Sequence, residues 1–353
     1  MSYISGKTHH SFQNENLIVD FRSDTVTQPT EEMRLAMANA KVGDDVYGDD
    51  PNVNELQGNV SSLLGKEASL FVTSGTQSNL CAILAHCHRG EEIITGDKYH
   101  VYIDEAGGAS VLGSIMMSPI KTDSNGSIDA EEIEKTVKPD DPHFPISRLL
   151  TLENTVSGKV QELNHMNTCI KSARKFGLST HLDGARIMNA SIKLAVPVKT
   201  IVENFDSVSL CLSKGLGAPA GSILAGSKDF IKKAYRIRKL LGGGMRQAGI
   251  LAAAGIYALE NNIQRLDYDH ENAILLAQQL HRINAITVIP ENVDTNMVFM
   301  KIPKESKNKI KKFCYENGIL INVESETIRL VTHLDISVEK INFFVKKMQS
   351  FFA

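Results

Sequence analysis

The sequence contains no tryptophan, and its five cysteines are scattered over 353 residues without a C-x-x-C pair. Neither a disulfide framework nor a zinc knuckle is therefore expected, and isolated thiols favour a reducing, cytoplasmic setting. No run reaches the roughly 20 apolar residues of a membrane helix, and the polar start of the chain lacks the apolar stretch of a secretory signal. His9 and His10 lie in this polar start without cysteines or carboxylates at ligand spacing, so no metal site is expected.

An excess of positive charge is also missing. Lys and Arg number 38 against 41 Asp and Glu, which gives a formal net charge of −3. Nucleic-acid binding needs a clear Lys and Arg excess on some surface, so no nucleic-acid partner is expected. With 42% hydrophobic and 22% charged residues, the composition is that of an ordinary globular protein. A chain of this length is long enough for two domains.

Short apolar runs alternate with segments of helical period through the first two-thirds of the chain. Buried strands are predicted at 69–72, 92–95, 148–152, 179–182 and 207–212. A helix is predicted over 51–64, with Pro51 in its first turn and Gly65 at its C-terminal cap, and another over 79–88. This alternation predicts an α/β fold with a mostly parallel sheet that helices cover on both faces. Ligands of such sheets bind beyond the carboxyl ends of the strands.

The pattern changes after the glycines at 242–244. An almost wholly apolar helix over 248–259 is expected to be buried or to pack against a partner. A smaller α+β arrangement follows, with segments at 271–283, 297–300, 307–317, 319–323, 328–331 and from 337 onward. We therefore expect a polar, flexible N-terminal extension over residues 1–18, a large domain over 19–265 and a small domain over 266–353.

Small and polar residues follow the first predicted strand. Ser74, Gly75 and Thr76 come after the run at 69–72 and open the next helix. Backbone N–H groups and the positive end of the helix dipole favour an anion at such a turn. The same residues are also common as an ordinary helix N-cap. The turn alone therefore predicts either a phosphate site or a cap.

Asp183 and Lys214 follow two later strands. Asp183 is either a cap for the next helix or a carboxylate facing a cationic ring nitrogen, with Arg186 available for a second carboxylate. Lys214 comes just after the run at 207–212, among small residues, where its side chain cannot easily extend into water. This position favours a Schiff-base nucleophile over a surface lysine.

These features together match the needs of pyridoxal 5′-phosphate. An anion cradle can hold the phosphate, a carboxylate can keep the pyridine nitrogen protonated, and a lysine can bind the aldehyde covalently. A dinucleotide fold fits poorly, because no G-x-G-x-x-G follows a strand near the N-terminus. The sequence therefore predicts a pyridoxal-phosphate enzyme.

From about residue 19 onward the chain resembles the low-specificity L-threonine aldolases, pyridoxal-phosphate enzymes of the aspartate-aminotransferase fold group (fold type I). The motifs that carry the resemblance are DFRSDTVTQPT (20–30), VGDDVYGDDPNVNEL (42–56), FVTSGTQSNL (71–80), EAGGASVLGS (105–114), LLTLENTVSGK (149–159), HLDGARIMNA (181–190), CLSKGLGAPAGS (211–222), KLLGGGMRQAGILAAAGIYAL (239–259) and RLVTHLD (329–335). The polar N-terminal extension is the main departure from the family pattern.

The resemblance implies cofactor-binding roles at the matching positions. It implies Lys214 as the Schiff-base lysine, Asp183 as the partner of the pyridinium nitrogen and His100 as the ring stacked on the cofactor. Arg186 is implied beside the cofactor and near the substrate. Gly75 and Thr76 match the phosphate turn, which Arg246 from a neighbouring subunit is implied to assist.

The resemblance also implies groups for the substrate. Ser23 and Arg329 match the groups that hold the substrate carboxylate. Arg329 also lies in a predicted strand, from which its planar fork could bind a carboxylate with two hydrogen bonds; a structural salt bridge is the alternative. Lys239 is implied nearby, and His143 matches a second histidine that faces the side-chain hydroxyl. The resemblance further implies a homotetramer, a dimer of dimers.

The implied reaction is retro-aldol cleavage of L-threonine or L-allo-threonine to glycine and acetaldehyde. His100, His143 or a water molecule is the candidate base, because histidine exchanges protons near neutral pH. The alternative is a β-eliminating lyase acting on a β-hydroxy or aromatic amino acid. A hydroxymethyltransferase is less favoured because no pteridine-binding pattern is evident, and a cofactor-free binding protein need not retain both Lys214 and Asp183.

Overall fold

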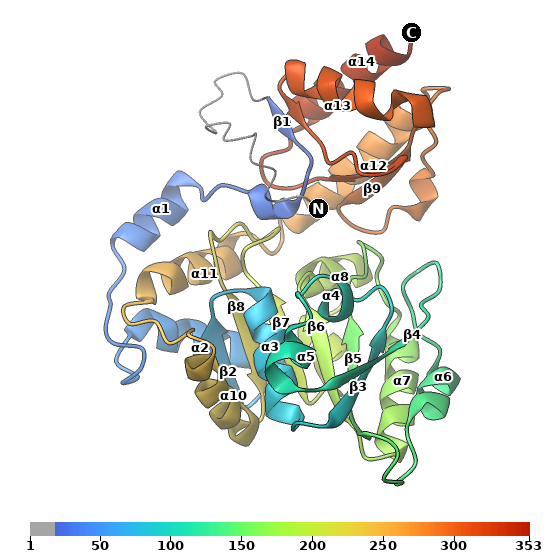
Figure 1. Cartoon of the computed structure of the whole chain (residues 1–353). Coiled ribbons are helices and arrows are strands. Elements are labelled where there is room, and N and C mark those ends of the chain that lie inside the picture. The colour runs from blue at the N-terminus through green and yellow to red at the C-terminus, as the bar shows by residue number, and fades with distance from the viewer. Residues whose placement is uncertain (1–17) are drawn as a thin grey trace. The chain divides into compact units, whose positions relative to one another are not determined.

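The computed structural model describes residues 18–353. The expected N-terminal extension, with His9 and His10, lies almost entirely outside the described residues. The chain forms two compact units. The large unit is Gln28–Leu266, and the small unit combines residues 18–27 with Asp267–Ala353 (Figure 1). The domain prediction placed residues 19–27 with the large domain, whereas here they group with the small unit.

A seven-stranded sheet forms the centre of the large unit. Its strand order is β2-β8-β7-β6-β5-β3-β4. The strands are β2 (Ala68–Val72), β3 (Glu91–Gly96), β4 (Met116–Ile120), β5 (Ile146–Glu153), β6 (Ser179–Gly184), β7 (Ser207–Cys211) and β8 (Ser222–Gly226). Only β8 runs antiparallel to its neighbours, and the other pairs are parallel. The predicted α/β class with a mostly parallel sheet is therefore confirmed.

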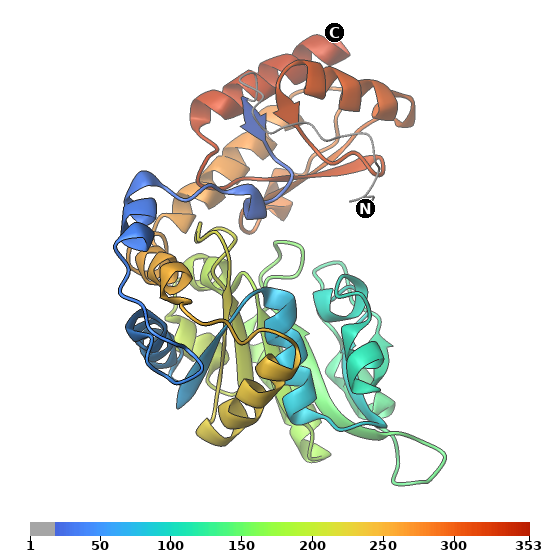
Figure 2. The same ribbon diagram turned by 60° about the vertical axis from the view of Figure 1, so that its left-hand side comes forward.

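Helices cover this sheet. They are α1 (Glu31–Ala38), α2 (Pro51–Leu64), α3 (Gly75–His86), α4 (His100–Ile103), α5 (Gly108–Gly113), α6 (Ala130–Thr136), α7 (Leu163–Lys175), α8 (Ile187–Leu194), α9 (Val198–Val202), α10 (Lys228–Leu240) and α11 (Gly249–Asn261). Helices α3 and α10 pack on each other and on strand β8, as Figure 2 shows for the light-blue and gold helices. Helix α7 packs on β5 and β6, and α2 packs on β2 and β8. Apolar side chains between these layers form the core.

Helix α2 shows how the local sequence determines an element's ends. Asp50 caps it by accepting a hydrogen bond from the backbone N–H of Val53, and Pro51 occupies its first turn. Gly65 ends it in the left-handed region at φ 63°, which glycine adopts without strain. Both predicted ends are therefore confirmed.

The apolar helix expected over 248–259 is α11, and it packs on α1 and α2 of its own chain. At Gly255 an added Cβ would lie 2.9 Å from side-chain atoms of both Leu56 and Leu212, so this close packing needs a glycine. Ile250 is the exception, with 45% of its surface exposed. The helix is thus covered mainly from within the chain and does not by itself require a partner.

The small unit contains two short β-pairs and three α-helices. Strand β1 (Val19–Asp20) pairs in parallel with β10 (Ile319–Leu320), and β9 (Met297–Lys301) pairs antiparallel with β11 (Thr327–Val331). Its helices are α12 (Leu266–His281), α13 (Lys307–Glu316) and α14 (Val338–Phe352), with 3₁₀ turns η1 (Asp24–Val26), η2 (Pro290–Asn292) and η3 (Lys304–Ser306). The expected order of strand, helix, two strands and helix is confirmed as β9-α13-β10-β11-α14.

The assignment of residues 19–27 to the small unit has a direct physical cause. Strand β1 adds backbone hydrogen bonds to β10, and the buried Phe21 ring contacts Phe344 with 4.9 Å between ring centroids. An aromatic side chain buried in the small core holds the segment there. None of the helices in the described part of the chain combines the length and apolar character that crossing a bilayer requires.

Candidate active site

Three adjacent parallel strands bring the predicted catalytic residues to one edge of the sheet. In the pairing of β5 with β6, Glu153 stands opposite Asp183, and in the pairing of β6 with β7, Asp183 stands opposite Ser209. Lys214 follows the end of β7. It lies close enough to His100 and Glu153 for its charge to influence their pKa values. The carboxyl edge of the sheet therefore gathers an amine, two carboxyl groups and a histidine.

The predicted phosphate turn lies at the N-terminus of α3. Ser74 is the N-cap, and its Oγ accepts a hydrogen bond of 3.1 Å from the N–H of Gln77. Gly75 and Thr76 begin the helix, and their N–H groups precede its internal hydrogen-bond ladder. The cap interpretation is therefore confirmed. The phosphate interpretation stays a prediction, since the first N–H groups and the positive end of the helix dipole are also what an anion would need.

A buried amide joins two carboxylates beside this turn. The Nδ2 atom of Asn79 donates to Asp183 Oδ2 and to Glu105 Oε1, both at 2.8 Å. Asp183 Oδ1 accepts from the N–H of Ala185 at 3.0 Å, and Glu105 Oε1 lies 2.9 Å from Nδ1 of His100. Asp183 is thus held as an acceptor on both oxygens and linked through Asn79 and Glu105 to His100.

The cluster of His100, Glu105 and Asp183 also has the composition of a metal site, since ligand atoms of all three lie within 4.8 Å of one another. However, Asn79 already donates to both carboxylates, and His100 is bonded to Glu105. A hydrogen-bonded set of this kind matches an organic cation facing Asp183. Asp183 in this hydrogen-bonded cluster is the residue that the resemblance implies for the ring nitrogen of the cofactor.

Burial and pairing move the pKa values of these groups in different ways. The hydrogen bond to Glu105 raises the pKa of His100, and this outweighs the lowering effect of burial. Burial raises the pKa of Glu105, which the bond to His100 opposes. Burial also raises the pKa of Glu153 to about 8, and the nearby charge of Asp183 adds to this rise. The oxygen Oε2 of Glu153 accepts a hydrogen bond of 2.7 Å from the backbone N–H of His100.

Sequence reasoning missed Asn79, Glu105 and Glu153. Glu153 ends the predicted strand at 148–152, so the rule that selected Asp183 could have selected it too. Glu105 and Asn79 carry no such signal. Their importance appears only when α3 and the loop after α4 pack beside β6.

Two buried histidines of the large unit predict how its stability depends on pH. Burial lowers the pKa of His181 to about 3 and that of His86 to about 4. In the unfolded chain both take up a proton as the pH falls below the ordinary value of 6.5, so the unfolded state then binds more protons. The free energy of unfolding should fall by about 1.4 kcal/mol per pH unit for each histidine.

Differential scanning calorimetry between pH 7 and roughly pH 4.5 measures this dependence. The variants His86→Gln and His181→Gln should each show a shallower loss of stability on acidification than the parent. The exposed His88 provides the matched control, and His88→Gln should keep the parental slope. Equal slopes for all four proteins would contradict the prediction.

The structure places His143 away from this cluster in its own chain. It precedes β5, whose far end carries Glu153, and seven steps along a strand span about 23 Å. Its side chain is 85% exposed, and Nδ1 lies 2.6 Å from Asp141 Oδ1. His143 therefore lies at the edge of the sheet opposite Asp183 and Lys214.

The glycine loop after α10 lies against the phosphate turn. An added Cβ at Gly243 would approach the side-chain amide of Gln77 to 2.4 Å. Lys239 lies beside the same loop, with its Nζ 3.2 Å from the position of a Cβ at Gly244. The guanidinium of Arg246 is 3.1 Å from Asp44 of the same chain and is largely exposed. Lys239 thus lies beside the loop that contacts Gln77, whereas Arg246 is paired with Asp44.

Arg186 and Lys214 line one small cavity in the large unit. Ser23 and Arg329, the two groups predicted to hold the substrate carboxylate, belong to the small unit. Nη2 of Arg329 donates to the carbonyl of Arg22 at 3.4 Å, which places the guanidinium next to the residue before Ser23. The structure therefore brings Ser23 and Arg329 into the same part of the small unit.

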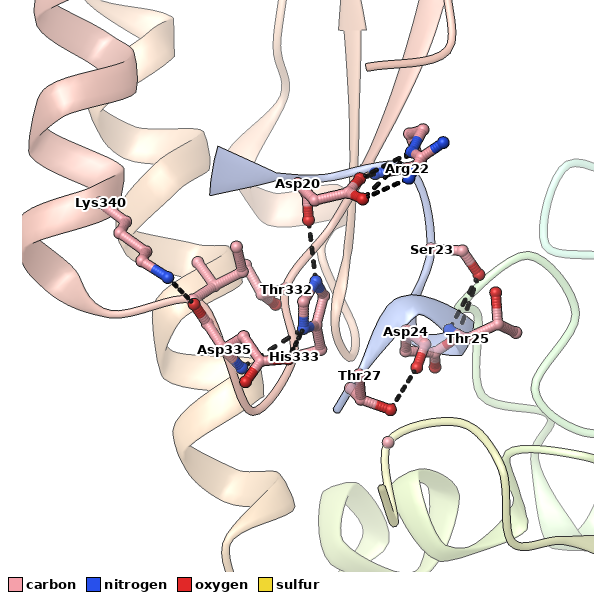
Figure 3. Close-up of polar contacts among 12 residues, drawn as sticks. Asp20, Arg22, Ser23, Asp24, Thr25, Thr27, Thr332, His333, Asp335 and Lys340 are labelled. Carbon is pink, nitrogen blue, oxygen red and sulfur yellow. Dashed lines mark hydrogen bonds and ion pairs between the residues drawn. The ribbon is translucent and has the colours of Figure 1, made fainter. Parts of the chain in front are cut away.

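The segment that carries Ser23 is held by further bonds within that unit, as Figure 3 shows. His333 donates from Nε2 to the carbonyl of Asp20 at 2.8 Å, and Arg22 forms a two-pronged ion pair with the Asp20 carboxylate. Ser23 Oγ accepts from the N–H of Thr25 at 3.2 Å and so caps the short turn η1. This bonding orders the segment around the predicted carboxylate groups.

Known proteins match this chain over nearly its whole length. The β-eliminating lyase family matches residues 20–303. The low-specificity L-threonine aldolase of Escherichia coli K12 is 48% identical over 336 residues, which cover 95% of this chain and 100% of that protein. The chain belongs to the low-specificity L-threonine aldolase family. A probable low-specificity L-threonine aldolase of Arabidopsis thaliana is 44% identical and matches 95% of this chain and 97% of its own length.

Solved structures of threonine aldolases share this fold. The Leishmania major threonine aldolase superposes with a TM-score of 0.81 at 19% identity, over 95% of this chain and 100% of that one. A putative L-allo-threonine aldolase from Listeria monocytogenes gives a TM-score of 0.78 at 18% identity, over 95% of this chain and 97% of that one. The predicted fold type I architecture is therefore confirmed.

The residues present in this threonine aldolase family member fit pyridoxal phosphate. The N-terminus of α3 suits the phosphate, and the Asp183 carboxylate, which accepts two hydrogen bonds from the protein, suits a protonated ring nitrogen. Lys214 is the amine at the same edge of the sheet. The chain thus offers one group suited to each of the phosphate, the ring nitrogen and the aldehyde.

Proposed function

We propose that this protein cleaves L-threonine and L-allo-threonine to glycine and acetaldehyde with pyridoxal phosphate as cofactor. The observation that carries the proposal is the 48% identity to the low-specificity L-threonine aldolase of Escherichia coli along that protein's full length. Lys214, Asp183 and the turn at Gly75 are all present and grouped around one edge of the sheet. The protein is accordingly a lyase that acts on a small amino acid.

When bound, the cofactor supplies an electron sink for the charge left on Cα after bond cleavage. The protein's own residues place the reactants. Lys214 provides the amine, Asp183 holds the proton on the ring nitrogen, and the N–H groups of Gly75 and Thr76 bind the phosphate. His100 is proposed to lie against the cofactor ring, and Arg186 to line the site beside Lys214.

Arg329 and Ser23 are proposed to bind the substrate carboxylate. With the carboxylate held, the Cα–Cβ bond can be kept perpendicular to the cofactor ring, which selects the bond that breaks. His100 is the weaker candidate for the base that takes the hydroxyl proton. Its bond to Glu105 raises its pKa, so it keeps its own proton over more of the neutral range. A water molecule or His143 then remains as the base.

We further propose that His143 serves the site of a second copy within a homotetramer. The support is its place at the opposite end of β5 from Glu153, since a rigid strand cannot bring it to its own site. Chains with Lys214→Ala and chains with His143→Ala should regain activity when unfolded and refolded together. Light scattering should give four chains per particle, and failure of the mixture to regain activity would contradict the shared site.

A cytoplasmic location is also proposed. All five cysteines are free and buried, which suits a reducing compartment. Fractionation of cells that make the protein, followed by immunoblotting, would test the location, and recovery with a membrane or secreted fraction would contradict it.

Product analysis is the decisive test of the proposed reaction. The purified holoenzyme is given L-threonine and, separately, L-allo-threonine, and glycine and acetaldehyde are quantified. Equimolar glycine and acetaldehyde are expected, and the ratio of the two rates measures the stereochemical preference. A 2-keto acid and ammonia would instead identify a β-eliminating lyase.

Arg329→Ala tests the carboxylate site. Loss of the guanidinium should raise the KM for L-threonine at least about 10- to 100-fold, the range for losing a single hydrogen bond to a charged group. Steady-state kinetics with both amino acids measure the effect. The matched control is Arg34→Ala, an exposed arginine on α1, which should leave KM unchanged. A fall in kcat at constant KM would contradict the assignment.

A further inference from the structure

Asn79 is the most completely bonded polar side chain near the site. It lies on α3, the helix whose N-terminus forms the phosphate turn, and only 1% of its surface is exposed. Its Nδ2 donates to Asp183 and Glu105, and its Oδ1 lies 3.1 Å from Nε2 of His181 and 2.9 Å from Oγ of Ser209. An amide offers two donors and two acceptor sites, so every one of them is filled.

The chemistry of the neighbours determines which way this amide points. Ionised carboxylates only accept hydrogen bonds, so the NH₂ group must face Asp183 and Glu105. The Oδ1 atom then needs donors, which places the proton of His181 on Nε2. Burial lowers the pKa of His181 to about 3, so this ring is neutral and its Nδ1 is an acceptor.

The donors and acceptors of the next two hydrogen bonds, from Ser207 and from His86, follow from the neutral His181 ring. The Ser207 hydroxyl lies 2.8 Å from Nδ1 of His181 and therefore donates to it. The same Ser207 oxygen lies 2.8 Å from Nε2 of His86, which therefore donates to Ser207. Every N–H and O–H from His86 to Asn79 thus points toward the two carboxylates, and aligned donors of this kind strengthen one another.

Each carboxylate leads to a different group at the cofactor. Asp183 is the proposed partner of the ring nitrogen, and Glu105 holds His100. Two carboxylates this close tend to share a proton unless donors stabilise both charges. Resting on the proposed function, we propose that Asn79 is a positioning residue that keeps Asp183 and Glu105 both ionised, and so sets the charge of the ring nitrogen together with that of His100.

The other charged groups near Asp183 come from every element around it. His100 on α4, Glu105 after α4, Glu153 at the end of β5 and His181 on β6 all feel its charge. Lys214, after β7, acts on both His100 and Glu153. Asn79 donates a hydrogen bond both to Asp183 and to Glu105. Removal of the Asn79 amide should therefore change the protonation of the ring nitrogen and of His100 together.

The first measurement is the pH titration of bound cofactor labelled with ¹⁵N in its ring, followed by NMR. In Asn79→Ala the ring nitrogen should lose its proton at a lower pH than in the parent. The expected change is about 10- to 100-fold in the proton equilibrium, the range for one hydrogen bond to a charged group. Ser78→Ala is the matched control, because Ser78 is adjacent, equally buried and bonded to Ser209 but to neither carboxylate.

The control should lose thermal stability without moving the ring-nitrogen titration. An equal titration for parent, Asn79→Ala and Ser78→Ala would overturn the proposal. If Asn79→Ala does not fold, Asn79→Leu keeps a similar side-chain volume and removes both donors without adding a charge. The ring nitrogen of that variant should again lose its proton at lower pH, and a parental titration would again overturn the proposal.

A second measurement needs no cofactor and so separates this proposal from the proposed function. In the cofactor-free protein, the NMR titration of His100 should occur above the ordinary histidine range, as the bond to Glu105 requires. In Asn79→Ala the two carboxylates should share a proton, so the His100 titration should move to lower pH. An unchanged His100 titration would overturn the proposal even if the protein proved to act on a different amino acid.

Discussion

Replacing Lys214 by alanine is expected to reduce threonine cleavage to the rate seen without enzyme. Lys214 is the amine proposed to bind the cofactor covalently, and it follows β7 at the edge of the sheet that also holds Asp183. Without this amine the cofactor loses its covalent attachment, and the visible absorption of the bound form should disappear. Loss of both the activity and the absorption would identify Lys214 as the covalent attachment point, because replacing a purely structural lysine would abolish neither.

Chemical trapping measures the same assignment directly. Borohydride reduction of the holoenzyme, followed by mass spectrometry of its peptides, should find the cofactor mass on the peptide containing Lys214. Lys239 is the internal comparison, because it is also implied near the site and lies on the neighbouring α10. Label on Lys239, or normal turnover by Lys214→Ala, would contradict the assignment.

The elements predicted best are those with a strong local cause. Strands β2, β3, β5, β6 and β7 each contain buried apolar residues, which fit a strand covered on both faces. Strands β4 and β8 were not predicted. Met116 and Met117 begin β4 at the exposed edge of the sheet, where little burial marks the sequence. Strand β8 follows a stretch of glycine, alanine and proline that is more typical of a loop.

The candidate site also contains residues that local sequence could predict and residues that it could not. Lys214 and Asp183 could be predicted because each follows a buried strand, and the ends of adjacent parallel strands meet in space. Asn79 could not be predicted, because its four bonds reach residues that lie far away in the sequence. For His143 the sequence predicts a role that the position within one chain does not explain. The family resemblance predicts its role, whereas the length of β5 separates it from its own Asp183.

Asp183→Asn is expected to slow cleavage by on the order of 10²- to 10³-fold, the usual effect of removing one electrostatic partner from an active site. The carboxylate is proposed to hold the proton on the ring nitrogen, and a neutral amide would not. With that nitrogen protonated, the bound cofactor would be the stronger electron sink for bond cleavage at Cα. KM should change much less than kcat, because Asp183 is not among the groups proposed to bind the substrate carboxylate.

The same substitution has a structural cost that must be separated from this effect. Asp183 accepts from the N–H of Ala185 on one oxygen and from Asn79 on the other. An asparagine there must turn its NH₂ group toward one of these donors, which should cost about 1–3 kcal/mol of stability. Thermal unfolding measures that cost. The ring-nitrogen titration by ¹⁵N NMR measures the catalytic cause, and a protonated ring nitrogen in a slow Asp183→Asn enzyme would contradict the role assigned to Asp183.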